Sequence, residues 1–271
     1  MEPTPIFFPE DGRFMRVACF VSGSGTNARR IIEGSHEEGS GYKVVLVFSD
    51  VRDDRKKRDG SKRCRAKEIA DEHGIAYECV DIRDFYGERG VKRAGDLTLR
   101  PEFDRLVLEA TGSYEIDVIA LAGYMSVTTA PLLEAYSGRI LNVHPADLSL
   151  MDGDERRYVG IHVVRDAILN GETELRASTH IAREKVDHGE VLVISEPVPV
   201  ELPKGVTLGA LKEDRKIRRE VVGDHQDSLK RQGDWVLYPL TLKMIAGGRF
   251  ALAGEGNLYL DGVKAPHGLR L

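Results

Sequence analysis

Short apolar runs alternate with helical patterns through the first half of the chain. Five of the runs are rich in β-branched residues and close on turn residues, which is typical of buried strands. They lie at Arg16–Val21, Lys43–Phe48, Ile75–Val80, Asp117–Leu121 and Arg139–Val143. Helical patterns separate them at Ala28–Glu33, Arg65–His73 and Pro101–Ala110. This alternation predicts an α/β fold with a Rossmann-like, mostly parallel sheet and helices on both of its faces.

The pattern changes after Val143. A helix is expected over Ile161–Leu169, followed by strands at Arg176–Ala182 and Glu190–Ser195. Because the link between these two strands is a short turn, we expect them to pair antiparallel at one edge of the sheet. A charged segment, Lys204–Gln232, comes next. The second half of the chain therefore adds to the parallel sheet rather than repeating it.

The last part of the sequence predicts a helix and a hairpin. An amphipathic pattern around Trp235–Ile245 indicates a helix. Two short apolar segments, Phe250–Leu252 and Leu258–Leu260, indicate a terminal hairpin. There is no internal repeat and no low-complexity linker, so these elements are expected to pack on the sheet as an extension of it.

We expect residues 1–271 to form a single domain. Its core would span about residues 16–200, and the C-terminal helix and hairpin would span about 201–271. Two charged stretches, Arg52–Arg63 and Arg83–Arg100, are expected to leave the scaffold as long excursions. Loops of that length are usually functional or mobile.

Bulk composition narrows the possible functions. The formal net charge is −5 and the basic clusters are flanked by acids, so no broad surface for nucleic acid is expected. The three cysteines lack the spacing of a metal site or a disulfide framework, which fits a reducing cytoplasmic location. No segment has the pattern of a membrane span or a signal peptide. We expect small-molecule substrates, no metal, no nucleic acid and no membrane, and a monomer or homodimer.

A polar, glycine-rich segment follows the first predicted strand and opens the first predicted helix. It consists of Gly23, Ser24, Gly25, Thr26 and Asn27. Glycines let a backbone approach a ligand closely, and free N–H groups at a helix N-terminus favour an anion. The segment is therefore a candidate phosphate site. A tight strand–helix turn with capping residues and no ligand would have a similar sequence.

The same segment admits an alternative ligand. Gly23-x-Gly25-x-x-Ala28 satisfies the dinucleotide-binding pattern, and Asp50 ends the second strand, where a ribose-binding acid belongs. An NAD-dependent oxidoreductase would hold its pyrophosphate at this turn. Both interpretations predict a phosphate here, so the rest of the chain must distinguish them.

Two polar residues lie at the end of the fifth predicted strand. Asn142 and His144 are two apart, so they project on the same side near the carboxyl end of a central strand. Open α/β sheets place their sites at that end. An asparagine amide can donate to a developing oxyanion, and a histidine can donate or shuttle a proton near neutral pH. The alternative is that both side chains satisfy local structure.

A series of short motifs occurs in a fixed order along residues 16–262. They are Ser22–Asn27, Leu121–Met125, Ser137–Pro145, Gly160–His162, Asp166–Gly171, Ser178–His180, Val186–Leu192 and Tyr238-Pro239. In content and order they resemble the formyltransferase family, most closely the phosphoribosylglycinamide formyltransferases of purine biosynthesis. A dinucleotide-binding enzyme has no reason to carry the later motifs.

This resemblance implies a folate-dependent formyltransferase. Such an enzyme moves a formyl group from 10-formyltetrahydrofolate, its co-substrate, to the amine of a phosphorylated small molecule, here glycinamide ribonucleotide. By matched position, Asn142 and His144 would polarise the formyl oxygen, and Asp187 would orient His144 and assist proton transfer. The chemistry requires no metal.

The resemblance also implies binding roles. The loop Gly23–Asn27 would hold the substrate phosphate. Substrate or folate would contact Gly123, Tyr124, Met125 and Asp234. His162 and His180 would give structural support.

One loop departs from the family pattern. Ala146–Val159 is long and acidic and lacks the two prolines that the family usually has there. Because it lies beside the predicted catalytic residues, acceptor identity or donor access is expected to differ. Three alternatives stay open: a formyltetrahydrofolate hydrolase, a non-catalytic paralogue that binds a phosphorylated ligand, and an NAD-dependent oxidoreductase.

Overall fold

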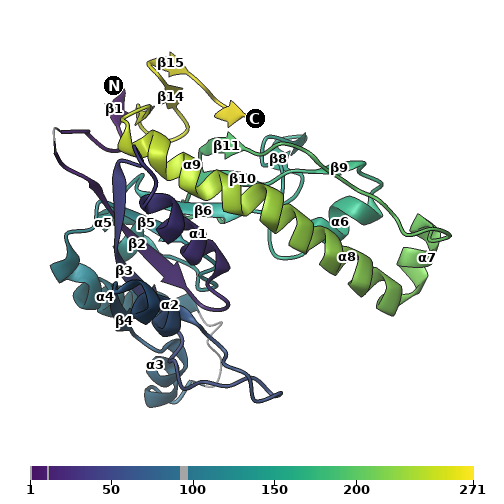
Figure 1. Cartoon of the computed structure of the whole chain (residues 1–271), viewed down its shortest axis with the longest axis horizontal. Coiled ribbons are helices and arrows are strands. Elements are labelled where there is room, and N and C mark those ends of the chain that lie inside the picture. The colour runs from purple at the N-terminus through teal and green to yellow at the C-terminus, as the bar shows by residue number, and fades with distance from the viewer. Residues whose placement is uncertain (1, 11, 92–96) are drawn as a thin grey trace.

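The computed structural model describes residues 2–10, 12–91 and 97–271. Its centre is an eight-stranded sheet in the order β16-β11-β10-β6-β5-β2-β3-β4 (Figure 1). The strands are β2 (Met15–Val21), β3 (Tyr42–Ser49), β4 (Ala76–Cys79), β5 (Val118–Leu121), β6 (Ile140–His144), β10 (Ser178–Ile181), β11 (Val191–Ile194) and β16 (Leu269–Arg270). From β6 to β4 all neighbours are parallel, whereas β10 runs antiparallel to both β6 and β11. The predicted α/β fold is confirmed, with β11 and β16 lying beyond the antiparallel strand.

The central strand β2 is buried on both faces because its side chains are apolar on both sides of the sheet. In β2, Val17, Cys19 and Val21 face one core, and Ala18 and Phe20 face the other. All five are fully buried, as expected for a parallel sheet that helices cover on both sides.

Helices cover both faces of the sheet. The helices are α1 (Thr26–Ser35), α2 (Ala66–His73), α3 (Ile82–Glu88), α4 (Arg100–Thr111), α5 (Ala130–Ala135), α6 (Val163–Leu169), α7 (Leu208–Glu213), α8 (Arg215–Leu229) and α9 (Trp235–Ala246). Buried residues of α1, α2 and α9 pack against one core. Those of α3, α4 and α5 pack against the other. All the strands and helices predicted from the sequence are present within a few residues of their expected bounds.

Two charged stretches contain helices that their composition does not indicate. In the 204–232 segment, α8 begins at Asp214, whose side chain accepts from the backbone N–H groups of Lys216 and Ile217. It buries Val221 and Leu229 among many charged neighbours, so its apolar stripe is too thin to recognise. The predicted excursion Arg83–Arg100 overlaps α3, and its residues 92–96 lie outside the described part of the chain.

The helix α9 is confirmed, but its predicted amphipathic character is wrong. Only Val236 and Lys243 of its residues are exposed, because the helix crosses the sheet and is covered by α1. The packing is close, since a Cβ atom at Gly34 would lie 2.7 Å from the Cβ of Pro239. A π-helical turn, η3 (Lys230–Asp234), joins α8 to α9, and the two form one long rod (Figure 1).

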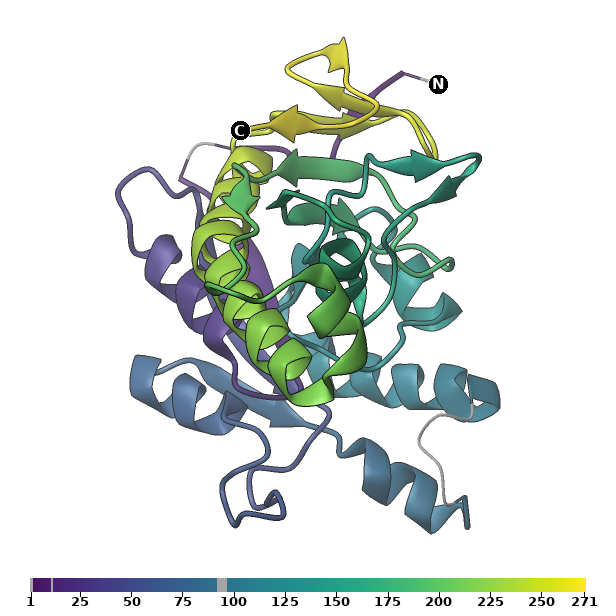
Figure 2. The ribbon, with the colours of Figure 1, turned by 90° about the vertical axis from the view of Figure 1, so that its right-hand side faces the viewer.

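Short strands close the ends of the molecule. The predicted hairpin is β13 (Phe250–Leu252) with β14 (Leu258–Leu260), and β1 (Thr4–Pro5) and β15 (Val263–Lys264) extend it. The first and last segments of the chain therefore lie at one end (Figure 2). Two further pairs are β7 (Met151–Asp152) with β8 (Glu155–Arg156) and β9 (Glu174–Leu175) with β12 (Val198–Pro199). Among the described residues, no helix is both long and apolar enough to cross a membrane.

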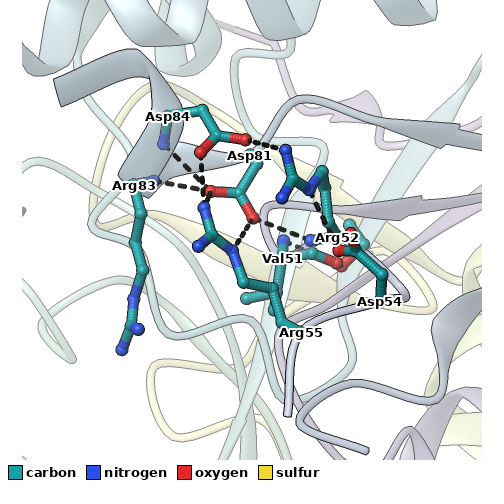
Figure 3. Close-up of polar contacts among 8 residues, drawn as sticks. Val51, Arg52, Asp54, Arg55, Asp81, Arg83 and Asp84 are labelled. Atoms are coloured by element: carbon teal, nitrogen blue, oxygen red, sulfur yellow. Dashed lines mark hydrogen bonds and ion pairs between the residues drawn. The ribbon is translucent and has the colours of Figure 1, made fainter. Parts of the chain in front are cut away.

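The first excursion is anchored by a charged cluster at its base (Figure 3). The buried carboxylate of Asp81 accepts from the backbone N–H of Arg52 at 2.8 Å and from the guanidinium of Arg55 at 2.9 and 3.1 Å. It also caps α3 by accepting from the N–H groups of Arg83 and Asp84. Burial opposes ionisation, but Arg55 and these N–H groups lower the pKa of Asp81 to about 2. One carboxylate thus fixes both the loop and the helix.

Replacing this carboxylate should release the loop. We expect Asp81→Ala to raise the rate of tryptic cleavage within residues 52–63 more than tenfold, because losing about 2 kcal/mol of local stability multiplies the open population by roughly 30. The control is Asp54→Ala, which removes an exposed partner of Arg52. Equal cleavage rates in the wild type and Asp81→Ala would contradict the anchoring role.

Candidate active site

A cavity of about 500 Å³ opens at the carboxyl ends of β5 and β6. It lies beside β2, where the strand order reverses, since β3 follows on one side and β5 on the other. Ligand sites of open α/β sheets form at such points. Most of the predicted site residues line it: Asn27, Gly123, Tyr124, Met125, Asn142, His144, Asp187 and Asp234.

The predicted catalytic residues meet through a fourth residue, His180. In the pairing of β6 with β10, Asn142 lies directly opposite His180. The Nδ2 atom of Asn142 is 3.2 Å from Nε2 of His180, which in turn is 3.5 Å from Oδ1 of Asp187. The other carboxylate oxygen of Asp187, Oδ2, is 3.5 Å from Nδ1 of His144. The four side chains form one continuous polar chain along the cavity wall.

The partners of the two imidazoles indicate where their protons lie. Nδ1 of His180 is 2.9 Å from the carbonyl oxygen of Ile181, which can only accept, so Nδ1 carries a proton. The other nitrogen, Nε2, faces both the amide of Asn142 and the carboxylate of Asp187, and the second N–H of the amide is left for the cavity. By the same argument Nε2 of His144, 3.2 Å from the carbonyl of Tyr158, carries a proton. Both nitrogens of His144 therefore face oxygen acceptors.

Burial and neighbouring charges shift the pKa values of His144 and Asp187 in opposite directions. Burial lowers the pKa of His144, although the charge of Asp187 opposes that shift. Burial would raise the pKa of Asp187, but contact with His180, the charge of His144 and the N–H of Gly160 together lower it to about 2. The resting pair is thus a carboxylate beside a neutral imidazole, and a proton arriving on His144 meets an ionised partner.

The loop that departs from the family pattern contributes contacts that the sequence did not reveal. Within the loop, the carbonyl of Tyr158 accepts a hydrogen bond from Nε2 of His144, and directly after the loop the N–H of Gly160 donates to Oδ2 of Asp187 at 3.0 Å. Arg156 contacts the backbone of the Asp187 turn. Each of these contacts has a backbone group as donor or acceptor, and backbone groups carry no sequence signal, so the contacts could not be predicted from residue types.

The glycine-rich loop reaches the cavity through Asn27. Gly25 has φ +65° at the start of α1, and a Cβ there would lie 2.4 Å from Cδ1 of Ile69, so packing requires glycine at this position. Ser24 is exposed, and it does not line the cavity. Gly23 does not line the cavity either, and its carbonyl accepts from the backbone N–H of Arg65.

Asn27 meets the residue that the π-helical turn η3 brings to the cavity. Its Nδ2 donates to Oδ2 of Asp234 at 3.3 Å, across 207 residues of sequence. Three further atoms in this corner are buried with no hydrogen-bond partner among the described residues: Thr26 Oγ1, Asn27 Oδ1 and Asp234 Oδ1. Burial raises the pKa of Asp234 to about 6. Orphaned polar groups are costly, which indicates that a polar ligand completes them.

Asp50, the residue behind the dinucleotide interpretation, is engaged elsewhere. Its buried carboxylate accepts from the hydroxyl of Ser126, in the loop that follows β5. The backbone N–H of Met125 in that loop donates to Ser22 at 2.8 Å. Asp50 therefore supports the cavity wall and does not itself line the cavity. Among the described residues, no group of three or more His, Cys, Asp or Glu could hold a metal ion.

Comparison with known proteins agrees with this geometry. The formyl transferase family matches residues 15–212. The chloroplastic phosphoribosylglycinamide formyltransferase of Arabidopsis thaliana is 30% identical over 141 residues, which are 52% of this chain and 41% of that protein. The crystal structure of glycinamide ribonucleotide transformylase 1 from Symbiobacterium toebii is 25% identical with a TM-score of 0.64, covering 92% of this chain and 95% of that one.

A second solved structure shares the fold alone. The formyltetrahydrofolate deformylase from Pseudomonas syringae is 18% identical with a TM-score of 0.59, covering 92% of this chain and 66% of that one. The matched part spans less than two thirds of the curated relatives' own lengths. Fold and site together define a Rossmann-like α/β protein whose cavity lies at the carboxyl edge of its sheet. The chain belongs to the formyl transferase family.

Asp234 should reduce the stability of the unliganded protein at neutral pH. Its pKa in the folded protein, about 6, lies above the ordinary value of 3.8 for an aspartate. The folded state therefore holds the extra proton between these values, and stability falls as pH rises through that window. We expect Asp234→Asn to raise the free energy of unfolding at pH 8 by roughly 1–3 kcal/mol and to change it little at pH 4.

Chemical denaturation without ligands at both pH values tests this. The control is Asp224→Asn, an exposed acid on α8 whose replacement should change stability by less than about 0.5 kcal/mol. An Asp234→Asn variant less stable than the wild type at pH 8 would contradict the assignment.

Proposed function

We propose that this protein transfers a formyl group from 10-formyltetrahydrofolate to the primary amine of a phosphorylated small molecule, glycinamide ribonucleotide in purine biosynthesis. The observation that carries the proposal is the polar chain from Asn142 to His144, which lines the same cavity as the orphaned polar groups beside α1. Membership of the formyl transferase family and the names of the relatives support it.

The acceptor would bind at the α1 end of the cavity. Its phosphate suits the glycine-rich loop, because free N–H groups at a helix N-terminus favour an anion. Its hydroxyl and amide groups suit the unpartnered oxygens of Asn27 and Asp234. Lys230 lines the same side and adds a positive charge. This corner gives a phosphorylated amine both a charge partner and hydrogen bonds.

The folate would bind at the apolar mouth of the same cavity. Three large side chains there are exposed, Met125 at 71%, Ile161 at 76% and Val186 at 54%. Exposed apolar groups gathered at a cavity mark a binding surface. Flat aromatic rings of the donor would cover them, and the formyl group would then point toward Asn142 and His144.

In the reaction, the acceptor amine attacks the formyl carbon and the carbonyl oxygen becomes an oxyanion. The free N–H of Asn142 stabilises that oxyanion. The nitrogen of His144 that carries no proton, Nδ1, takes the proton that the amine loses and passes it to the leaving nitrogen of the folate. Asp187 stabilises the imidazolium while the proton resides there, since its carboxylate is already ionised. The tetrahedral intermediate then collapses and releases tetrahydrofolate.

Hydrolysis of the donor is the principal competing function. The deformylase structure shares the fold, so the fold does not separate the two reactions. A hydrolase uses water and needs no corner for an acceptor, whereas this cavity has one in which Asn27 and Asp234 each have a buried oxygen with no partner among the described residues. That corner favours transfer to an amine.

Release of tetrahydrofolate from 10-formyltetrahydrofolate should depend on an added amine. We expect turnover with glycinamide ribonucleotide, followed spectroscopically, and none with buffer alone. Turnover without acceptor would identify a hydrolase. Binding of both substrates without turnover would identify a non-catalytic paralogue.

His144→Ala should lower kcat by at least about a hundredfold, because it removes the group that moves the proton. The control is His162→Ala, an exposed histidine before α6 that does not line the cavity. It should keep nearly full activity. An active His144→Ala variant would refute the proposed role.

A further inference from the structure

The loop that departs from the family pattern forms a support for the Asp187 turn. Within Ala146–Val159, β7 and β8 make a short hairpin. Its second strand lies against the 185–189 segment, where Glu155 pairs with Lys185 and His188 at the exposed rim. Deeper in the contact, Arg156 and Gly160 bind the turn itself.

Arg156 binds two carbonyls of this turn at once. Its Nη1 donates to the carbonyl oxygen of Asp187, and its Nη2 donates to that of Gly189 at 2.8 Å. The side chain is half-buried. A planar guanidinium offers two donors in a fixed fork, which no other side chain can match. The fork therefore fixes the distance and direction between two backbone groups on either side of His188.

The turn needs this external support because its backbone conformation is unfavourable. Asp187 has φ +58°, a left-handed conformation that costs a non-glycine residue about 1–2 kcal/mol. Gly189 is packed so tightly that a Cβ would lie 1.9 Å from the carbonyl oxygen of Ile181. A strained backbone conformation persists at a site only where several surrounding contacts hold it in place.

Small movements of the turn would affect the carboxylate of Asp187. Its two oxygens lie 3.5 Å from His180 and His144, at the outer limit of useful contact. A misplacement of about 1 Å at such a distance can cost a hundredfold in rate. The backbone conformation at position 187 is therefore a determinant of the polar chain.

We propose that Arg156 is a positioning residue that holds the Asp187 turn and so keeps the Asp187 carboxylate against His144 and His180. Arg156 does not line the cavity, so it acts through Asp187 and not on the substrate. This inference rests on the proposed formyl transfer for its kinetic consequence, while its structural consequence stands by itself.

The test compares Arg156→Met, which keeps the length of the stem, with the wild type. We expect kcat to fall about ten- to hundredfold, with the KM for glycinamide ribonucleotide unchanged, because the acceptor corner is not touched. In an Asp187→Asn background the same substitution should change kcat less than about threefold, since residues that act as one unit are not additive. Full additivity of the two substitutions would overturn the proposal.

Hydrogen exchange supplies a readout that does not need turnover. We expect amides 186–190 to exchange faster in Arg156→Met than in the wild type, without a large fall in Tm. The control is Lys185→Met, which removes an ion pair that is more than half exposed and should change neither exchange nor kcat. If the wild type shows no transfer, the proposed function fails and the exchange data alone decide the role of Arg156.

A second variant separates geometry from charge. Arg156→Lys keeps the positive charge but cannot bridge two carbonyls with a fixed fork. We expect this variant to have a kcat below that of the wild type, and its amides 186–190 to exchange as fast as those of Arg156→Met. Full recovery by lysine, or unchanged kcat and exchange in Arg156→Met, would overturn the proposed fork.

Discussion

The site depends on a buried carboxylate that must stay ionised. Asp187 is 6% exposed, and an isolated charge at such a depth would be protonated instead. Two imidazoles and one backbone N–H lower its pKa to about 2. Those partners come from three separate segments, β6, β10 and the loop after β8. The antiparallel strand β10 is thus required, because it brings His180 opposite Asn142 and beside the carboxylate.

The corner formed by Asn27 and Asp234 differs, because not all of its buried polar atoms have hydrogen-bond partners. Asn27 and Asp234 meet through one hydrogen bond, and an oxygen of each has no partner among the described residues. The π-helical turn η3 places Asp234 there, and π-bulges often occur at functional sites. The polar side chains on one wall of the cavity therefore contact one another, whereas on the other wall two buried oxygens are available to a ligand. Catalytic groups benefit from the first condition and binding groups from the second.

The sequence predicted the parts of the site that follow from local periodicity. The strand ending at His144 and the two-residue spacing from Asn142 were sufficient to place both side chains at the carboxyl edge of the sheet. The position of Asp187 followed from the resemblance to a family. Arg156 and Gly160 could not be predicted, because their role depends on how a hairpin packs against a distant turn. Asp50 was misleading for a similar reason, since its contact with Ser126 crosses 76 residues.

The loop after β6 shows how a family pattern can change while its constraint remains. Prolines restrict a loop by fixing φ, and this chain lacks the two that the family usually has there. A paired hairpin and the fork of Arg156 restrict the same region through hydrogen bonds instead. The unusual composition of the loop therefore does not indicate a relaxed site. It changes the rim beside the cavity, where Ile161 and Val186 are exposed, while Arg156 and Gly160 hold the backbone and carboxylate of the Asp187 turn.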